Sequence, residues 1–256
     1  MFRSVTEVRG SRFNSTDSCD FLDEYERLLD ERIRLEESRQ PSKTFAPSQL
    51  RCKRISWFRL RGVEPEVSPI ANRGLQFTAT IGTAIHEAIQ SNLKSYLGDD
   101  WIDVEDYLKS KSLSFEYKCT TSGYETQVEI KNPPVKFAPD GIIRYKGKLM
   151  LLEIKSSEYT SFEKLSAPKP QHINQIMTYG TLLDLDSAFV LYVDRQYGNY
   201  KCFEVTITDE DRTSVLEMFN EVMRCVDANI APPKLPSGDA WCSPARCRYY
   251  NKCKEW

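Results

Sequence analysis

Apolar residues recur at helical spacing in several parts of the chain. The clearest stripe predicts an amphipathic helix over about 79–97, because an isoleucine or leucine stands at every fourth position: Ile81, Ile85, Ile89, Leu93 and Leu97. Further helical segments are predicted at 20–38, about 171–184 and about 210–229. Ser48 is a plausible N-cap for one more helix, which would carry Cys52 and Trp57.

Strand-like apolar runs occupy much of the remaining chain. Turn residues such as Gly123, Lys146-Gly147 and Gly198-Asn199 separate them. Strands are predicted at 113–119, 124–130, 137–145, 148–155, 187–194 and 200–207. Helices and strands in this order predict a single α/β domain with a mostly central sheet over 41–256. A polar arm and a charged surface helix are expected over 1–40.

Composition places the chain among ordinary globular proteins. Of its 256 residues, 40% are hydrophobic and 28% are charged. The net charge of -2 excludes a globally basic nucleic-acid binder, so any contact with nucleic acid has to come from a local patch. Apolar runs such as Leu149–Leu152 are far too short to cross a bilayer, and no apolar stretch follows Met1. We therefore expect a cytoplasmic protein of a bacterial, archaeal or phage-infected cell that has no membrane partner.

Charge is unevenly distributed along the chain. The segment 20–38 carries eight acidic residues. From Pro41 to Val63 there is no acidic residue and there are six basic ones: Lys43, Arg51, Lys53, Arg54, Arg59 and Arg61. The segment 242–256 is also basic. These two basic segments are the candidates for a local patch that contacts nucleic acid.

Eight cysteines are unusual in a chain with no visible export signal. Disulfides are improbable in a reducing cytosol, so some thiols should belong to the core and others could bind metal. Four cysteines are scattered, and we expect them to be core thiols: Cys19, Cys119, Cys202 and Cys225. By contrast, Cys242, Cys247 and Cys253 fall within twelve residues and form a candidate metal site.

Acidic residues and a lysine meet at one predicted hairpin. Asp140 begins one strand, and Glu153 and Lys155 end the next. In an antiparallel hairpin the start of one strand lies beside the end of the other, and residues two apart share a face. Carboxylates with water and substrate phosphate suit Mg²⁺ or Mn²⁺. The lysine could help to activate water or stabilise a developing charge.

Each of these signals is weak when taken alone. The chain contains a second Glu-x-Lys triplet, Glu129-Ile130-Lys131, which lacks an aspartate one hairpin upstream. Glu153 and Lys155 could also be a solvated strand end, although the apolar residues before them on both faces favour a buried central strand. A lone helical histidine such as His86 is more often structural than a ligand. His172 is expected on the surface or in an N-terminal turn.

Gln175 and Tyr179 lie four residues apart on a predicted helix. They therefore share one helical face. They could be a polar edge of the core or part of a site.

Taken in order, four motifs resemble the RecB-like branch of the PD-(D/E)xK nuclease superfamily. The matching motifs cover roughly residues 45–256, and they are Gly82-x-x-x-His86, Asp140-Gly141, Glu153-Ile154-Lys155-Ser156 and Gln175-x-x-x-Tyr179 with Leu182-Leu183. The resemblance implies a restriction-endonuclease-like core, in which helices flank a central mixed sheet. Ala138-Pro139 departs from the glycine-rich lead of many relatives, although it removes no ligand.

The resemblance also implies roles for individual residues. The Mg²⁺ or Mn²⁺ ligands would be His86, Asp140, Glu153 and the backbone carbonyl of Ile154. Lys155 would handle the attacking water. Gln175 and Tyr179 would orient the lysine or the DNA strand. The implied catalytic set is therefore Asp140, Glu153, Lys155, Gln175 and Tyr179.

The cysteines are similar in arrangement to those of iron–sulfur RecB-like exonucleases, which include CRISPR-adaptation, AddB-type and phage nucleases. One cysteine, Cys52, precedes the nuclease core and three follow it: Cys242, Cys247 and Cys253. The resemblance implies a [4Fe–4S] cluster that joins the N- and C-terminal segments like a clasp. Four residues stand between Cys242 and Cys247, where the family usually has two, so zinc remains the alternative. Unliganded surface thiols are a third possibility.

These features predict a metal-dependent DNA exonuclease, and the resemblance implies a preference for single-stranded ends. The expected DNA contacts are Arg51, Lys53, Arg54, Trp57, Arg59 and Tyr249, although the aromatic residues could instead pack around the cluster. The alternatives are a non-catalytic nucleic-acid-binding module and an endonuclease of the same fold. A helicase, an integrase or a recombination protein could be a partner, and relatives sometimes form oligomers.

Overall fold

The computed structural model describes residues 20–40, 42–66, 72–111, 113, 115–236 and 238–256. The chain divides into two compact units, one of Met1–Arg39 with Val67–Gln76 and the other of Gln40–Glu66 with Phe77–Trp256. The first unit contains α1 (Asp20–Glu37), which confirms the charged helix. Within this unit, Arg73 forms an ion pair with Asp30, Nε to Oδ1, at 2.6 Å.

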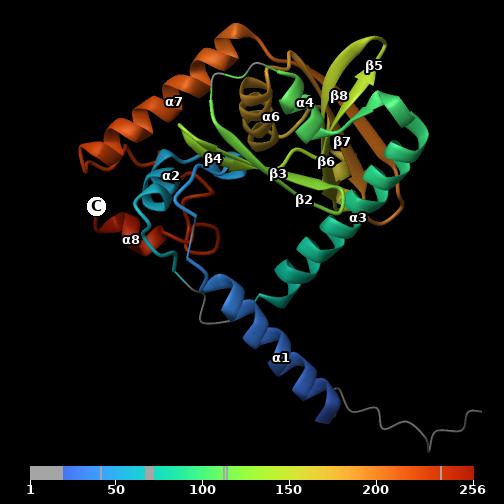
Figure 1. Ribbon diagram of the computed structural model, residues 1–256. Helices are drawn as coiled ribbons and strands as arrows, with labels where there is room; N and C mark the ends of the chain where they lie inside the picture. The colour runs from blue at the N-terminus through green and yellow to red at the C-terminus, as the bar shows by residue number, and fades with distance from the viewer. Residues whose placement is uncertain (1–19, 41, 67–71, 112, 114, 237) are drawn as a thin grey trace, which may run out of the picture. The chain divides into compact units, whose positions relative to one another are not determined.

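A five-stranded mixed sheet forms the centre of the second unit (Figure 1). Its strands, in spatial order, are β1 (Trp101–Ile102), β5 (Gly141–Tyr145), β6 (Lys148–Ser157), β7 (Ser187–Asp194) and β8 (Tyr200–Thr206). The β6–β7 pair is parallel and the other three pairs are antiparallel. The predicted hairpin is confirmed, because Gly141 at the start of β5 pairs with Leu152 in the middle of β6, which continues beyond the hairpin to Ser157.

A second, antiparallel sheet corrects one of the predicted strands. It contains β2 (Tyr117–Ser122), β3 (Glu125–Lys131) and β4 (Pro134–Phe137). The single strand expected over 137–145 is wrong, since β4 ends at Phe137 in this sheet and β5 begins at Gly141 in the other. Pro139 has no N–H to donate to a ladder, so the chain leaves the small sheet there. Asp140 consequently occupies the link between the two sheets.

Helices flank the central sheet, as expected for this fold class. They are α2 (Lys53–Leu60), α3 (Arg73–Leu97), α4 (Val104–Ser110), α5 (Tyr159–Glu163), α6 (Pro170–Leu183), α7 (Asp209–Asp227) and α8 (Tyr250–Lys254), with short 3-10 turns η2 (Pro47–Gln49) and η3 (Gly98–Asp100). The predicted cap at Ser48 is wrong. Ser48 lies inside η2, which begins at Pro47, and the extended residue Cys52 is the N-cap of α2. None of the helices in the described residues has the length and apolar character to cross a bilayer.

Alternate residues of β6 contribute to two separate apolar clusters. Leu151 belongs to the larger cluster, which includes side chains of α2, α4, α6 and α7. Leu152 and Ile154 belong to a smaller one with Ile89 of α3, against which Ile85 and Leu93 pack. The predicted stripe of α3 is therefore its core-facing side. Because both faces of β6 are covered, a charged residue near its end is held in a dry environment.

The α2 helix and the C-terminal residues pack together within the second unit (Figure 1). Trp57 and Phe58 are fully buried. The Phe58 ring stacks on Tyr249 with centroids 5.0 Å apart, and Trp57 Nε1 donates to the Cys225 carbonyl at 3.1 Å. These contacts join α2 to the C-terminal residues, and the predicted iron–sulfur clasp between the two segments stays a prediction.

The scattered cysteines only partly fulfil the expectation of core thiols. Cys119 and Cys225 are half-buried and pack against the core. Cys202 is exposed, so the prediction is wrong there. The residues of β8 alternate between half-buried and exposed positions, and Cys202 falls on the exposed face. Cys19 lies outside the described residues.

Candidate active site

Asp140 is held by three hydrogen bonds at the junction of α3, β5 and β6. One carboxylate oxygen, Oδ1, lies 3.0 Å from His86 Nδ1, and the other accepts from the Ile154 amide at 2.6 Å. The Asp140 carbonyl accepts from Gln90 Nε2, also at 2.6 Å. Its position is therefore fixed through both the side chain and the backbone.

Glu153 and Lys155 project from the same face of β6, as their spacing predicts. Glu153 is 1% exposed, and its Oε1 lies 2.5 Å from Lys155 Nζ. Its other oxygen, Oε2, is buried and has no hydrogen-bond partner among the described residues. A buried carboxylate oxygen that lacks a partner carries a desolvation cost. A ligand that pairs with Oε2 would remove this cost and stabilise the site.

Opposing influences act on the ionisable groups of this site. Burial raises the pKa of Glu153, and the negative charge of Asp140 raises it further against the opposing effects of Lys155 and His86. Burial disfavours the charged form of Lys155, but the adjacent Glu153 outweighs it and raises the pKa of the lysine. In the same way, Asp140 overcomes burial and raises the pKa of His86. The carboxylates thus favour positive charge at both neighbouring bases.

Gln175 and Tyr179 lie on the buried side of α6. Gln175 Nε2 donates to the Tyr179 hydroxyl at 2.9 Å. Burial raises the pKa of Tyr179, and the charge of Glu153 raises it further. This tyrosine is therefore close enough to the carboxylates to be influenced by their charge. The described hydrogen bond joins the two residues to each other, so any contact with Lys155 stays a prediction.

Two polar residues near the site, Gln90 and Tyr192, were not singled out in the sequence. Gln90 is four residues after His86 and therefore shares its helical face, which was the available signal. His172 lies in the first turn of α6, which is one of the two positions predicted for it. Its Nδ1 is 2.6 Å from the Tyr192 hydroxyl. Tyr192 is the register neighbour of Lys155 across the β6–β7 pair, a long-range relationship that no local pattern reveals.

The donor set at Asp140 and Glu153 fits a divalent cation in its chemistry. As the side chains stand, no three His, Cys, Asp or Glu groups in the described part of the chain have the spacing to bind a metal ion. The unpartnered Oε2 of Glu153 is nevertheless a hard oxygen ligand of the kind that Mg²⁺ and Mn²⁺ prefer. A bound cation would provide the partner that this oxygen lacks.

The four predicted cluster cysteines influence one another electrostatically, but no three of them have the spacing to bind a metal ion as the described side chains stand. Burial raises the pKa of Cys247, and the neighbouring Cys52, Cys242 and Cys253 raise it further through their charges. All four are free thiols. Cys52 is the N-cap of α2 and Cys253 lies on α8, so the two belong to segments separated by most of the chain.

Burial corrects several of the predicted DNA contacts. Trp57, Arg54 and Tyr249 are 0%, 7% and 5% exposed, so the two rings are core residues and offer no face to a base. Lys53 is engaged by Glu221. Arg59 donates to the Thr44 carbonyl and to Ser42.

Two predicted DNA contacts, Arg51 and Lys53, keep exposed side chains. Arg51 is exposed and pairs with Asp239 at 3.0 Å. Its guanidinium lies 5.5 Å from the ring centre of Trp241, and that of Arg246 lies at the same distance. Trp241 is 41% exposed and was not singled out in the sequence.

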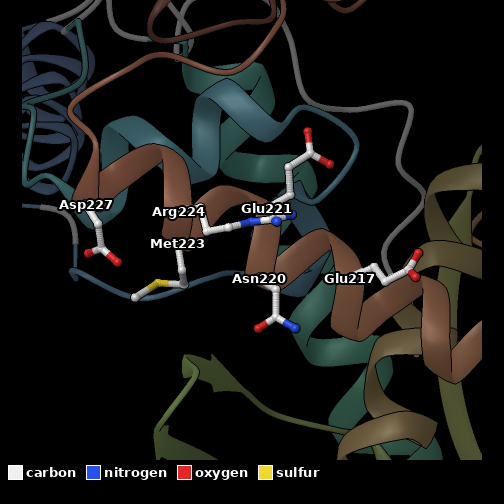
Figure 2. A pocket seen from close by; sticks show the side chains of 6 residues that line it. All are labelled: Glu217, Asn220, Glu221, Met223, Arg224 and Asp227. Atoms are coloured by element: carbon white, nitrogen blue, oxygen red, sulfur yellow. The ribbon is translucent and has the colours of Figure 1, made fainter.

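A surface hollow runs along α7, and one of its lining residues, Glu221, is the partner of Lys53. Figure 2 shows the six side chains that line it, and none of them belongs to the predicted site. They are Glu217, Asn220, Glu221, Met223, Arg224 and Asp227.

Comparison with known proteins gives structural likenesses at low identity. No family model matches the sequence, and no curated protein is significantly similar to it. The protein SSO0001 has a TM-score of 0.44 and 16% identity over 83% of this chain and 98% of its own. LHK-Exo in complex with dAMP has a TM-score of 0.43 and 17% identity, with 78% of this chain and 93% of that chain covered. Another structure of LHK-Exo, an alkaline exonuclease from Laribacter hongkongensis, has the same TM-score and coverage at 13% identity. A function for this chain therefore has to be inferred from its own residues.

Proposed function

We propose that the chain is a metal-dependent DNA exonuclease of the RecB-like branch of the PD-(D/E)xK superfamily. One observation carries the proposal. A buried carboxylate, Glu153, has one oxygen paired with Lys155 and the other without a partner, beside an Asp140 that is fixed by His86. The order of the motifs in the sequence supports the same assignment.

The metal ion would be Mg²⁺ or Mn²⁺, held by His86, Asp140, Glu153 and the backbone carbonyl of Ile154. When bound, such an ion lowers the pKa of water and offsets the charge of a phosphate group. The Ile154 amide already holds Asp140 Oδ2, so the other oxygen, Oδ1, would be the one to bind the ion beside His86. Gln90 holds the backbone carbonyl of Asp140 in place.

Lys155 has two conceivable roles, and its surroundings favour one of them. Its side chain is 20% exposed, so Nζ is accessible to a substrate while remaining in contact with Glu153. Glu153 raises the pKa of the lysine, which favours the protonated form of Nζ. Lys155 would then stabilise negative charge on the phosphate in the transition state and would not remove a proton from water. Tyr179, with Gln175 as its donor, would limit the room beside Glu153.

The cysteine site would hold a [4Fe–4S] cluster, with zinc as the alternative. Four free thiols are a suitable donor set for either one in their chemistry, although the four side chains would have to move together to hold it. Hydrolysis transfers no electrons, so the role of this site would be structural. It would reinforce the packing of α2 against the C-terminal residues.

The substrate would be a single-stranded DNA end. The preference for single strands comes from the resemblance, and the exposed ring of Trp241 between Arg51 and Arg246 is suited to stack on an unpaired base. Strand separation would fall to a helicase, and an integrase or recombination protein could also be a partner. Oligomers like those of relatives remain compatible with this proposal.

A nuclease assay on matched linear and circular single-stranded DNA tests the proposal. With Mg²⁺ or Mn²⁺, the linear strand should be degraded to nucleotides and the circular strand should persist. Equal cleavage of the circle would indicate an endonuclease. Binding of both strands without any cleavage would indicate a non-catalytic module.

A further inference from the structure

A buried hydroxyl joins β7 to the start of α6 beside the proposed active site. Tyr192 is 1% exposed, and its hydroxyl accepts from the Lys169 amide at 2.9 Å. The same hydroxyl lies 2.6 Å from Nδ1 of His172, in the first turn of α6. Lys155 is the register partner of Tyr192 in the parallel β6–β7 pair, so the two side chains leave the sheet on one face. His172 therefore lies over the part of the sheet that carries Lys155.

The hydrogen bonds of Tyr192 determine which nitrogen of His172 carries the proton. Because the Lys169 amide is a donor, the Tyr192 oxygen already acts as an acceptor, and its own O–H still needs an acceptor. Nδ1 of His172 is the acceptor within reach, and a buried O–H without one would be costly. Nδ1 is then unprotonated, and the proton of the neutral ring is on Nε2.

His172 is also kept neutral by its surroundings, and its second nitrogen is free. Burial, together with the positive charges of Lys155 and Lys169, lowers the pKa of His172 to about 3. Within the described residues, the side-chain hydrogen bond of His172 is the one through Nδ1. Of the fully buried side-chain atoms that lack a partner there, none belongs to His172. Nε2–H is therefore a donor without a partner that a ligand can reach.

A neutral N–H beside a lysine suits a phosphate oxygen. Phosphate oxygens of nucleic acids accept hydrogen bonds from neutral polar side chains as well as from arginine and lysine. Lys155 is 20% exposed and lies 2.5 Å from the carboxylate of Glu153, which offsets part of its charge before a substrate binds. A second donor from a different element would therefore add to the hold on a phosphate at this place.

We propose that His172 is a phosphate-binding residue of the active site, and that its Nε2–H donates to a phosphate oxygen of the bound DNA strand beside Lys155. This inference rests on the proposed nuclease function and adds a substrate contact to it. The neutral donor holds the phosphate equally in the ground state and the transition state, whereas Lys155 acts on charge that develops in the transition state. His172 thus contributes to affinity and Lys155 to the cleavage rate.

His172 could instead serve only as the partner of Tyr192, and two substitutions separate these roles. His172→Asn retains an oxygen that can accept from the Tyr192 hydroxyl, but its side chain is too short to place a donor at the position of Nε2. His172→Gln retains an acceptor and a donor that reaches further. Asn174→Ala is the matched control, because it removes a polar side chain from an exposed position two residues along α6.

Affinity for a short linear single-stranded oligonucleotide is measured in Ca²⁺, and single-turnover cleavage is measured in Mn²⁺. His172→Asn should bind about tenfold more weakly, the effect of losing one hydrogen bond to a charged group, while its rate at saturating DNA changes little. His172→Gln should recover most of the affinity, and Asn174→Ala should match the unaltered chain. One neutral methylphosphonate, placed at each linkage in turn, should weaken binding at a position to which His172→Asn is no longer sensitive.

The ring can also be observed directly, because the chain has only two histidines. The imidazole ¹⁵N signals of His172 are assigned by their loss in His172→Gln. They should show Nδ1 without a proton and Nε2 with one, and the Nε2–H signal should shift when the oligonucleotide is added in Ca²⁺. A role limited to holding Tyr192 would leave that signal unchanged. This measurement decides the question if His172→Asn does not fold.

Two results would overturn the proposal. In one, His172→Asn binds the oligonucleotide as tightly as the unaltered chain. In the other, Nε2 carries no proton, or its signal is the same with and without DNA. The proposed function fails in a different way, because an unaltered chain that binds the oligonucleotide but never cleaves it in Mn²⁺ would refute the nuclease and leave the phosphate contact standing. An unaltered chain that does not bind the oligonucleotide would refute both.

Discussion

Gln90 donates its side-chain amide to the backbone carbonyl of Asp140 at a distance of 2.6 Å. Gln90 is 4% exposed, and His86 on the same face of α3 contacts the carboxylate of the same aspartate. The helix therefore holds Asp140 at two points. Asp140 follows Pro139 between the two sheets, where no ladder fixes it, so these contacts from α3 and the Ile154 amide of β6 define where its carboxylate lies.

Replacement of Gln90 by leucine should weaken metal-dependent activity without removing a proposed ligand. The variant leaves a buried carbonyl unsatisfied and frees Asp140 to move. The Mn²⁺ concentration for half-maximal activity should rise about tenfold, as expected for a residue that orients a ligand. Asn92→Ala, on the exposed side of α3, is the control and should behave like the unaltered chain. An unchanged Mn²⁺ dependence in Gln90→Leu would show that Gln90 has no positioning role.

Lys155→Met should abolish cleavage while DNA binding is retained. The substitution preserves most of the side chain's length but removes the charge that is proposed to stabilise the transition state. A loss of about 100-fold or more in the single-turnover rate is expected for a group with this role. DNA affinity, measured without cleavage in Ca²⁺, should change only slightly. Full activity in Lys155→Met would exclude the lysine from the mechanism.

His172 should make the protein less stable in acid. Burial lowers the pKa of His172 to about 3, and the positive charges of Lys155 and Lys169 contribute. A histidine in an unfolded chain titrates near pH 6.5. Below that pH the unfolded chain therefore binds a proton that the folded chain does not bind. The stabilising contribution of the neutral histidine is therefore complete above about pH 6.5 and declines as the pH falls toward about 3.

Denaturant titrations at pH 7 and pH 5 test this dependence. The free energy of unfolding should fall less between the two pH values in His172→Gln than in the unaltered chain. Gln is a suitable replacement because it can accept a hydrogen bond from the Tyr192 hydroxyl without titrating. An identical fall in both proteins would mean that His172 takes up its proton as readily in the folded state.

Lys201→Met should destabilise the fold through the end of α5. Lys201 Nζ donates to the carbonyls of Phe162, Glu163 and Leu165 at 2.8, 3.0 and 3.1 Å. Loss of a charged donor to these groups should lower the free energy of unfolding by about 1.5–3 kcal/mol. Lys148→Met, at an exposed position of β6, is the control and should have little effect. Equal stability of the two variants would contradict this account of Lys201.

Periodicity in the sequence predicts the long elements of this fold well. The stripe of α3, the helices α6 and α7, and the strands β6 and β7 all lie close to their predicted positions. Short elements such as α4 and α8 are missed because they are too short to display a period. The break at Pro139 is missed because strand propensity continues on both sides of it, and only the division into two sheets reveals it.

The candidate site is predicted in part, for a physical reason. Asp140, Glu153 and Lys155 can be related through one hairpin, where local pairing rules apply. Lys155 and Tyr192 become neighbours only through the parallel pairing of β6 with β7, which joins segments that are far apart in the sequence. The burial of Arg54 and Trp57 also depends on a distant partner, the C-terminal segment, so their polar or aromatic character suggested a surface role.

The chain contains an internal control for its central claim. Glu129 and Glu153 both begin a Glu-x-Lys triplet on a β-strand, but Glu129 is exposed and Glu153 is buried beside Asp140. The decisive measurement is the rate at which Glu129→Gln and Glu153→Gln release nucleotides from linear single-stranded DNA in Mg²⁺ or Mn²⁺. Glu129→Gln should match the unaltered chain, and Glu153→Gln should be slower by about 100-fold or more. Undiminished activity in Glu153→Gln would contradict the proposed active site.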